Sequence, residues 1–253
     1  MRLILAGCEY SGTTTLSCAI AKWTRENMGE RIGYHDHWKL PHINHPPIQT
    51  QAELDEAFEA WAQGRGEDPT YSGLTPHEQE LFNALTPKIK ECFQRYHMEY
   101  HIGQSFYALP DHNMIGMHYD EAVYAPLYYG YGGPGQYADR ELCAREIEEA
   151  IMKAAPDTVL VLLKAAPKVI ATRMNETPHP HAVVQEKDIE YVVGKFEDQY
   201  ERSLIKSKFT VDTGTATIEE SLSEFVSKYE PLLTDADRMR ILVHKARQRG
   251  EWV

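Results

Sequence analysis

The sequence contains few cysteines and no long run of apolar residues, and each shortage excludes a class of protein. The four cysteines form no CxxC or zinc-like pair, so we expect reduced thiols in a cytoplasmic protein: Cys8, Cys18, Cys92 and Cys143. The apolar run that starts the chain ends at Ala6, whereas a membrane span needs about 20 apolar residues and a secretory signal needs a longer apolar region. We therefore expect neither membrane insertion nor secretion.

Positive charge is scarce as well. The chain has 26 Lys and Arg against 38 Asp and Glu, which gives a formal net charge of -12. Such a surface repels phosphate backbones and anionic lipid, and the sequence has no local basic patch to offset that repulsion. Nucleic acid is therefore not an expected partner. The length of 253 residues, with 42% hydrophobic residues, is ordinary for a globular protein.

Short apolar runs alternate with stretches of helical spacing. The expected strands are 3–6, 31–35, 114–117, 157–163 and 209–211, and the expected helices are 14–28, 139–154, 167–174, 186–205 and 217–229. Strands that alternate with helices of this length indicate a parallel sheet covered on both faces. The sequence thus predicts a three-layer α/β fold with a sheet of about five strands.

One long stretch interrupts this alternation. Between the second and third strands, at about 41–112, a Pro- and His-rich linker is followed by helical segments at 53–63 and 76–100. We expect a helical insertion at this place. A further helix, rich in Arg and Lys, is expected at 234–249, where it would dock on the surface.

A glycine-containing loop lies between the first expected strand and the first expected helix. The residues from Gly7 to Thr14, GCEYSGTT, have the P-loop spacing G-x-x-x-x-G-x-T, in which backbone N–H groups and a helix N-terminus surround phosphates. The lysine that usually precedes the final Ser/Thr is Thr13 here, so the charge that contacts the outer phosphates is missing. A plain strand-to-helix turn is the alternative interpretation. The predicted nucleotide-binding residues are Gly7, Ser11, Gly12, Thr13, Thr14 and Thr15, and the Thr14 hydroxyl would also coordinate Mg²⁺.

With this loop and this order of elements, the chain resembles the P-loop kinases of the deoxynucleoside kinase and thymidylate kinase type. The resemblance covers about 1–40 and 113–230, which would form the core of a single domain spanning 1–253. It implies ATP and Mg²⁺ as cofactors. It also implies a nucleoside- or nucleotide-like substrate that accepts a phosphoryl group.

The resemblance assigns catalytic roles to Asp36 and Arg173 and a metal-binding role to Asp120. Asp36 follows the second strand and would orient the acceptor hydroxyl; a loop acid or helix cap is the alternative. Arg173 precedes the expected lid and would clamp the transferred phosphoryl group, unless it is a surface arginine. Asp120 follows the third strand and would hold Mg²⁺ through water, or else cap the helix that begins near Ala122.

Three residues are predicted to contact the substrate: Arg95, Tyr119 and Tyr124. Arg95 lies on the inserted helix, where related kinases grip the acceptor, although an i, i+4 pair with Glu91 or Glu99 fits the sequence equally well. The tyrosines of 124–137 could stack on a nucleobase or pack on the insertion.

Histidine is abundant, with 12 residues in the chain. The denser groups are His35, His37, His42 and His45 in one place and His179 and His181 in another. Prolines between these histidines give no rigid frame for a zinc site, so we favour polar segments over metal binding. The second group falls in the expected lid, at 174–187, where related kinases carry arginines and this chain offers histidines and Lys187. Lys164 and Lys168 could replace part of the missing loop charge.

The sequence therefore predicts ATP- and Mg²⁺-dependent phosphoryl transfer to a nucleoside- or nucleotide-like small molecule. Two alternatives stay open. Because Thr13 replaces the loop lysine, the chain could bind a nucleotide without catalysing transfer. It could also be a kinase of a modified base or a sugar. The sequence leaves a homodimer open.

Overall fold

Five parallel strands form one sheet in the order β2-β3-β1-β4-β5. The computed structural model describes residues 1–30, 32, 34–36, 56, 60, 76–108, 111–179 and 182–251. The strands are β1 (Arg2–Ala6), β2 (Tyr34–Asp36), β3 (His112–Ile115), β4 (Val159–Lys164) and β5 (Ser207–Asp212). The predicted α/β fold with about five parallel strands is confirmed. Because β1 lies between β3 and β4, the strand order reverses beside β1, which is where open α/β sheets bind ligands.

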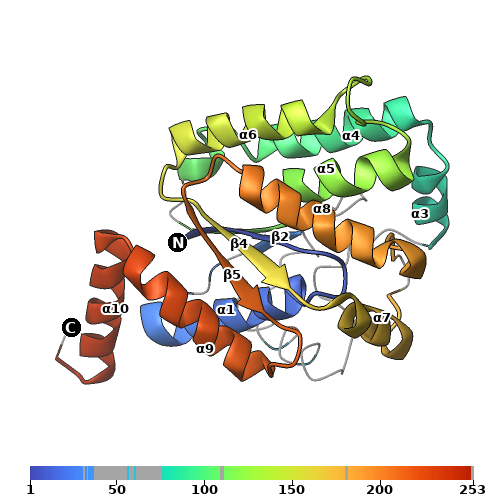
Figure 1. Ribbon diagram of the computed structural model, residues 1–253. Coiled ribbons are helices and arrows are strands. Elements are labelled where there is room, and N and C mark those ends of the chain that lie inside the picture. Colours follow the sequence, from blue (N-terminus) through green and yellow to red (C-terminus); the bar gives the residue numbers. More distant parts are fainter. Residues whose placement is uncertain are drawn as a thin grey trace.

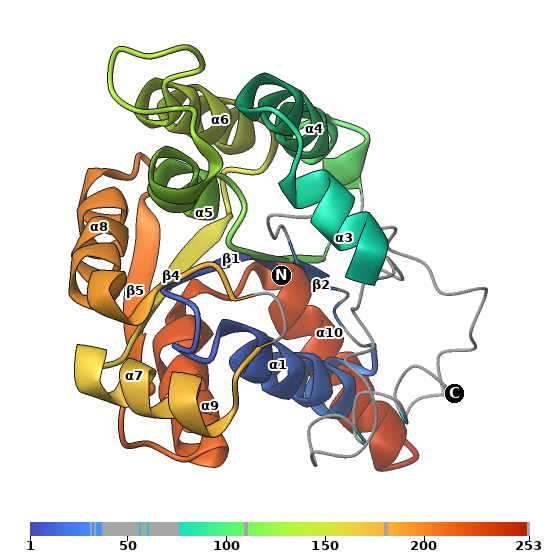
Figure 2. The same ribbon diagram turned by 90° about the vertical axis from the view of Figure 1, so that its right-hand side faces the viewer.

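Helices cover both faces of the sheet (Figure 1). They are α1 (Thr13–Met28), α3 (Pro76–Asn83), α4 (Pro87–Tyr100), α5 (His118–Tyr124), α6 (Arg140–Ala154), α7 (Pro167–Glu176), α8 (Ile189–Arg202), α9 (Ile218–Tyr229) and α10 (Asp235–Gln248). Figure 1 shows α4, α5, α6 and α8 on one side of the sheet and α1 and α9 on the other. The final helix α10 packs beside α1, as Figure 2 also shows.

Side chains that alternate along the strands build a separate core on each face. On β1, Ile4 and Ala6 belong to the core shared with α5, α6 and α8, whereas Leu3 and Leu5 belong to the core shared with α1 and α9. All four side chains are buried, because both faces of the strand are covered. This double burial explains why β1 and β4 read as unbroken apolar runs in the sequence.

Most predicted elements begin or end one to three residues from their predicted boundaries, and two of the differences have a definite physical cause. The third strand lies two residues earlier than the predicted 114–117, because Gly116 and Met117 take φ angles of +71° and +52° that end it. The predicted helix 76–100 is two helices, because Pro87 begins a new helix at the first helical position.

The inserted region contributes α3 and α4 between β2 and β3. Most of the predicted helix 53–63 lies outside the described residues, although Glu56 and Ala60 are helical.

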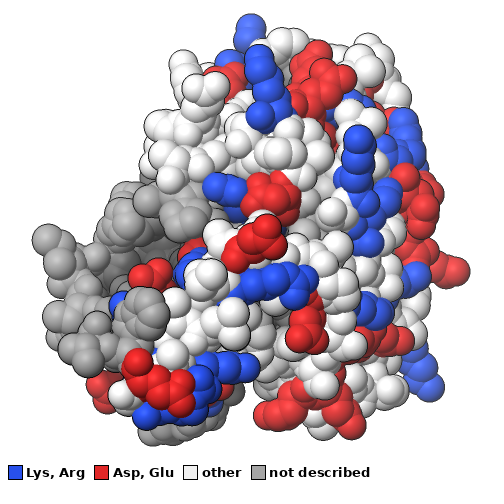
Figure 3. Space-filling view, turned by 90° about the vertical axis from the view of Figure 1, so that its left-hand side faces the viewer, with Lys and Arg blue, Asp and Glu red and all other residues white. Residues whose placement is uncertain are grey.

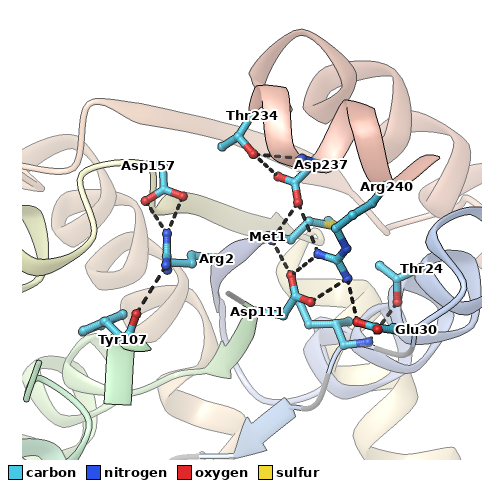
Figure 4. Close-up of polar contacts among 11 residues, drawn as sticks. Met1, Arg2, Thr24, Glu30, Tyr107, Asp111, Asp157, Thr234, Asp237 and Arg240 are labelled. Atoms are coloured by element: carbon cyan, nitrogen blue, oxygen red, sulfur yellow. Dashed lines mark hydrogen bonds and ion pairs between the residues drawn. The ribbon is translucent and has the colours of Figure 1, made fainter. Parts of the chain in front are cut away.

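The edge of the sheet where the strands begin, here called the amino edge, carries a compact group of ion pairs (Figure 4). Arg240 on α10 donates to both carboxylate oxygens of Asp111, at 3.0 and 2.8 Å, and contacts Asp237 at 3.5 Å. The amino group of Met1 lies 2.5 Å from Asp111 and 3.2 Å from Asp237. Burial by itself would raise the pKa of Asp111, but hydrogen bonds from Arg240 and the amino group outweigh it and lower that pKa. These four residues, the amino-edge cluster, hold α10 against the sheet.

The surface beyond the amino edge mixes charges of both signs. Figure 3, which views the molecule from the left of Figure 1, shows Lys and Arg side chains interspersed with Asp and Glu over the described residues. Among those residues, no helix is long and apolar enough to span a bilayer.

Candidate phosphate-binding site

The loop after β1 takes a conformation that depends on its two glycines. An added Cβ at Gly7 would lie 2.5 Å from Ser11 Oγ and 2.9 Å from the carbonyl oxygen of Leu163, so a larger residue would force a shift. Gly12 has a φ of +91°, in the left-handed region, and directly precedes the first residue of α1. The predicted strand–loop–helix context of this motif is confirmed.

The start of α1 leaves hydrogen-bond donors at the edge of the sheet where the strands end, here called the carboxyl edge. Gly12 supplies no side-chain cap, and the first turn contains no acidic residue. The N–H of Leu16 donates to Gly12 at 2.9 Å and so begins the helical ladder. The N–H groups of Thr13, Thr14 and Thr15 precede this first intrahelical hydrogen bond, so the helix itself supplies no carbonyl acceptor for them. Together with the helix dipole, such groups favour an anion at this place.

Residues from distant parts of the chain bond to the loop carbonyls. Thr213 Oγ1 donates to the carbonyl of Ser11 at 2.6 Å. Arg173 donates through Nη1 to the carbonyl of Tyr10 at 3.0 Å, and through Nη2 to the carbonyls of Thr213 and, at 3.4 Å, Gly214. Arg173 and Thr213 therefore fix the loop and join it to the segment that follows β5. Figure 2 shows the corresponding closeness of α7 to the start of α1.

This arrangement bears on the predicted role of Arg173. The structure brings Arg173 to the loop, but its guanidinium binds three backbone carbonyls. A group engaged in this way is suited to hold the loop in shape rather than to clamp a phosphoryl group. Of the lysines considered with it, Lys164 pairs with Glu197 at 2.5 Å, and Lys168 is exposed in the first turn of α7.

A polar atom is buried beneath the loop without a partner. Ser11 Oγ is buried and has no hydrogen-bond partner among the described residues. Ser11 and Cys8 line a cavity of about 10 Å³, which has room for a single water. Burial, with the nearby charges of Glu9 and Asp120, raises the pKa of Cys8, so this thiol stays protonated and is a poor nucleophile.

The side chains of Glu9 and Tyr10 reach the segment between α7 and α8. Glu9 Oε2 accepts hydrogen bonds from the N–H groups of Val183 and Val184 at 2.7 and 2.8 Å. The Tyr10 hydroxyl accepts one from the N–H of His179 at 2.9 Å, and the two rings stack with centroids 4.2 Å apart. Tyr10 does so with a φ of +67°, which is unusual for a residue other than glycine. The loop itself thus holds this segment in place.

The end of β3 forms the other side of the candidate site. The N–H of Met117 donates to the carbonyl of Ile115 at 2.9 Å, which closes a tight turn around Gly116. An added Cβ at Gly116 would collide with the Asp120 carboxylate, so the glycine makes room for that acid. Asp120 lies in the first turn of α5, and its charge acts on Cys8 of the loop. The structure therefore brings Asp120 to the loop, as its predicted metal role requires.

Asp36 is the last residue of β2 and pairs in register with Ile115 of β3. Its backbone thus lies at the carboxyl edge, on the side of β3 away from β1. The side chain of Asp36 is outside the described residues, as are His37, His42, His45 and His181.

The residues predicted to contact the substrate are engaged elsewhere. The hydroxyl of Tyr119 is buried and bonds to Glu148 at 2.6 Å and Ser203 at 2.8 Å, which argues against a contact with substrate. Tyr124 is also buried, and its hydroxyl accepts the N–H of Glu9 at 2.9 Å, so it supports the loop from below.

Arg95 pairs with two acids of its own helix. It lies 3.2 Å from Glu91 and 3.6 Å from Glu99. This is the i, i+4 pairing that the sequence left as an alternative to substrate binding.

Sequence reasoning missed a buried ionic group next to α4. Arg140 contacts Glu121 at 3.0 Å and Glu91 at 3.3 Å, and Tyr131 donates to Glu121 at 2.9 Å. All four residues are buried. The sequence held only a weak signal for this group. Two acids, Glu91 and Glu121, occupy helical positions that face the core, and Arg140 directly follows the N-cap Asp139.

Comparisons with known proteins support the fold. No protein-family model matches the chain, and no curated protein matches it either. Among solved structures, the deoxyadenosine kinase from M. mycoides with bound dATP matches with a TM-score of 0.51 and 13% identity, covering 91% of this chain and 100% of that one. This chain has the P-loop kinase fold.

Two further solved structures match at lower TM-scores. The YorR protein from Bacillus subtilis, in complex with phosphorylated GDP, has a TM-score of 0.49 and 16% identity over 92% of this chain and 99% of that one. Shikimate kinase from Bacteroides thetaiotaomicron has a TM-score of 0.45 and 12% identity over 91% and 98%. At such identities the likeness concerns the fold alone.

Proposed function

We propose that the chain transfers the γ-phosphoryl group of ATP, with Mg²⁺, to a hydroxyl or phosphate of a nucleoside- or nucleotide-like small molecule. The observation that carries the proposal is the start of α1. It places the N–H groups of Thr13, Thr14 and Thr15 at the carboxyl edge, beside the strand where the sheet order reverses. The fold shared with the deoxyadenosine kinase supports this function.

The residues present fit a nucleotide phosphate and its metal ion. Gly7 and Gly12 keep the loop free of side chains where the backbone must approach the phosphates. Mg²⁺ usually binds one or two protein oxygens together with phosphate oxygens and waters, so the half-buried Thr14 and Asp120 suffice as candidates. When bound, the ion would neutralise negative charge that develops during transfer. The chain's own part is to hold the phosphates through the loop N–H groups.

Asp36 and Arg173 have different parts in this proposal. Asp36, at the end of β2, would orient the acceptor hydroxyl and accept its proton. Arg173 would act through the loop, because it is bonded to the carbonyl of Tyr10. We also take 1–253 to be one domain that works in the cytoplasm, consistent with four cysteines that form no disulfide among the described residues, and we leave a homodimer open.

Nucleotide binding without transfer is a second candidate function. The observation that favours it is Thr13, which leaves the loop without a cation. A unit charge at about 4 Å is worth on the order of 4 kcal/mol at an effective dielectric constant near 20, before desolvation costs. Unless another cation supplies that interaction, transfer would be slow.

A direct experiment separates these candidates. The purified chain is titrated with ATP and Mg²⁺ by calorimetry, and release of ADP is then measured with a panel of nucleosides, nucleoside monophosphates and sugars. Acceptor-dependent ADP release supports the kinase. Binding without turnover for every acceptor supports the second candidate, and the absence of any ATP binding contradicts both.

A further inference from the structure

The chain between α7 and α8 is held by side chains from distant parts of the sequence. Glu9, in the phosphate-binding loop, accepts the N–H groups of Val183 and Val184 on one carboxylate oxygen, at 2.7 and 2.8 Å. Figure 2 shows that the chain there passes close to the start of α1. We call residues 182–188, which lead into α8, the latch segment. The loop itself therefore makes two hydrogen bonds to the backbone of the latch segment.

A second anchor of the latch segment comes from the π-helical turn Ala125–Tyr129, directly after α5. The hydroxyl of Tyr128 accepts the N–H of Gln185 at 3.3 Å and donates to the carboxylate of Asp188 at 3.0 Å. Tyr128 thus reaches the later half of the segment, whereas Glu9 reaches its first half. The two anchors can therefore be removed and measured one at a time.

The burial of Val184 makes the Glu9 carboxylate important for docking. The Val184 side chain is 4% exposed and belongs to the core shared with α5, α6 and α8. A backbone N–H that enters such surroundings without an acceptor loses its bond to water and carries a desolvation cost. The carboxylate supplies that acceptor, and its charge makes the hydrogen bond stronger than a neutral one. Apolar packing and the charged acceptor thus favour the same docked position.

The position of Glu9 is itself fixed by the protein. Its N–H donates to the buried Tyr124 hydroxyl at 2.9 Å, and the hydroxyl of the next residue, Tyr10, accepts the N–H of His179 at 2.9 Å. Every donor and acceptor in this arrangement belongs to the chain. The docking of the latch segment therefore requires no ligand.

We propose that Glu9 is a latch, which docks residues 182–188 on the phosphate-binding loop before any nucleotide binds. This inference rests on the proposed function for the role of the loop, and it deepens that function. Many enzymes order a segment beside the site only when the substrate binds, and part of the binding free energy is then used for that ordering. In this chain the ordering precedes binding, so ATP meets a latch segment that is already in position.

The test is amide hydrogen exchange on the full chain without nucleotide, because exchange reports the local opening of individual backbone N–H groups. Glu9→Gln keeps the length of the side chain and removes its charge, whereas Glu9→Asp keeps the charge and shortens the reach. Glu190→Gln is the matched control, since Glu190 is exposed in the first turn of α8. The amides of α9, on the opposite face of the sheet, report any general loss of stability.

We expect the amides of Val183 and Val184 to exchange at least about 10-fold faster in both Glu9 variants than in wild type or the control, with α9 unchanged. Tyr128→Phe should instead affect the amide of Gln185 most. Saturating ATP and Mg²⁺ should change the exchange of Val183 and Val184 in wild type by less than about twofold, because their docking is complete beforehand.

Three results would overturn the latch: equal exchange of Val183 and Val184 in wild type and both Glu9 variants, faster exchange that extends equally to α9, or protection in wild type that arises only with ATP. Calorimetry with ATP and Mg²⁺ on the same preparations keeps this test separate from that of the proposed function. Absence of ATP binding contradicts the proposed function, and the exchange without nucleotide still decides on the latch. ATP binding with equal exchange contradicts the latch alone.

Discussion

At the amino edge of the sheet Asp111 is bonded to Arg240 and to the amino group of Met1, whereas at the carboxyl edge α1 begins at Thr13 with no side-chain cap. The first arrangement pairs its charges within the protein and so contributes to stability. The second leaves donors available and so contributes little until an anion binds. The same molecule thus pairs its polar groups for structure at one edge and leaves the start of a helix without a side-chain cap at the other, where the proposed function puts the nucleotide.

Backbone strain is also found at the carboxyl edge. Of the three described non-glycine residues with positive φ, Tyr10 and Met117 lie at the carboxyl edge, and Ala138 lies in the loop before α6. Strained residues of this kind cost on the order of 1–3 kcal/mol each and tend to occur at functional sites. Substitutions at the carboxyl edge should therefore change binding or turnover, and those at the amino edge should change stability alone.

The largest expected effect is that of Gly12→Val. A residue with a Cβ is strained at a φ of +91°. We therefore expect the loop to change conformation, so that its N–H groups no longer reach the phosphates. The loss of two charge-assisted hydrogen bonds lowers affinity for ATP by about 100-fold or more. Calorimetry with ATP and Mg²⁺ checks this. Gly194→Val is the control, because an added Cβ there meets nothing within 4 Å. Full ATP affinity in Gly12→Val would place the nucleotide site elsewhere.

Asp36→Asn is expected to act on turnover rather than on binding. If Asp36 is the base of the proposed mechanism, its loss should lower kcat by at least about 100-fold, while the affinity for ATP stays unchanged because the loop is intact. Steady-state kinetics with the best acceptor gives both quantities. Asp198→Asn, on the exposed side of α8, serves as the control. Near-normal kcat in Asp36→Asn would remove this residue from the mechanism.

The elements around the loop could be predicted from the sequence because their signals are local. Each of three signals is contained in a few consecutive residues: the apolar run of β1, the apolar run of β4 and the glycine spacing between β1 and α1. The end of β3 was missed by two residues, since Gly116 and Met117 leave the strand through positive φ angles that apolar composition does not reveal.

The partners of the loop could not be predicted, because they come from far along the chain. Arg173 and Tyr10 are 163 positions apart, and Thr213 and Ser11 are 202 apart. The sequence placed Arg173 near the loop through its resemblance to kinases. It could not show that the guanidinium donates hydrogen bonds to carbonyl oxygens, because those bonds depend on the position of the segment after β5.

Arg173→Ala tests whether this arginine acts on the loop or on the phosphoryl group. Removing its bonds to three carbonyls should lower the free energy of unfolding by about 1.5–3 kcal/mol without any nucleotide present, and transfer should be lost because the loop no longer holds its shape. Arg173→Lys should restore only part of the stability, because an ammonium group lacks the planar fork. Urea unfolding provides the measurement. Unchanged stability with lost turnover would instead support a direct phosphoryl clamp.

Asp111→Asn tests the amino edge. The lowered pKa of Asp111 means that the carboxylate stabilises the fold above the ordinary aspartate pKa of about 3.9, and that this contribution disappears as the pH falls through the lowered value. Wild type should exceed Asp111→Asn in stability by about 1 kcal/mol at pH 7, and the two should converge in strong acid. Affinity for ATP should be equal. A drop in ATP affinity would show that the two edges are coupled.

The smallest expected effect, and the one that separates the two uses of charge most sharply, is that of Thr13→Lys. A cation in the first turn of α1 opposes the helix dipole, so the free energy of unfolding should fall by about 0.3–1 kcal/mol without nucleotide. The same cation contacts the phosphates when ATP binds, so the affinity for ATP should rise by a few fold, on the order of 1 kcal/mol for a partly solvated charge pair.

Urea unfolding and calorimetry on the same preparation measure the free energy of unfolding and the affinity for ATP. Thr15→Lys, at an exposed position in the same first turn, should show the same loss of stability and so isolates the dipole effect on unfolding. A gain in affinity in Thr13→Lys without any loss of stability would mean that the lysine is held by another group of the chain, such as Glu9, the acidic residue of the loop. Equal affinity in wild type and Thr13→Lys would show that another cation already supplies the charge that Thr13 lacks.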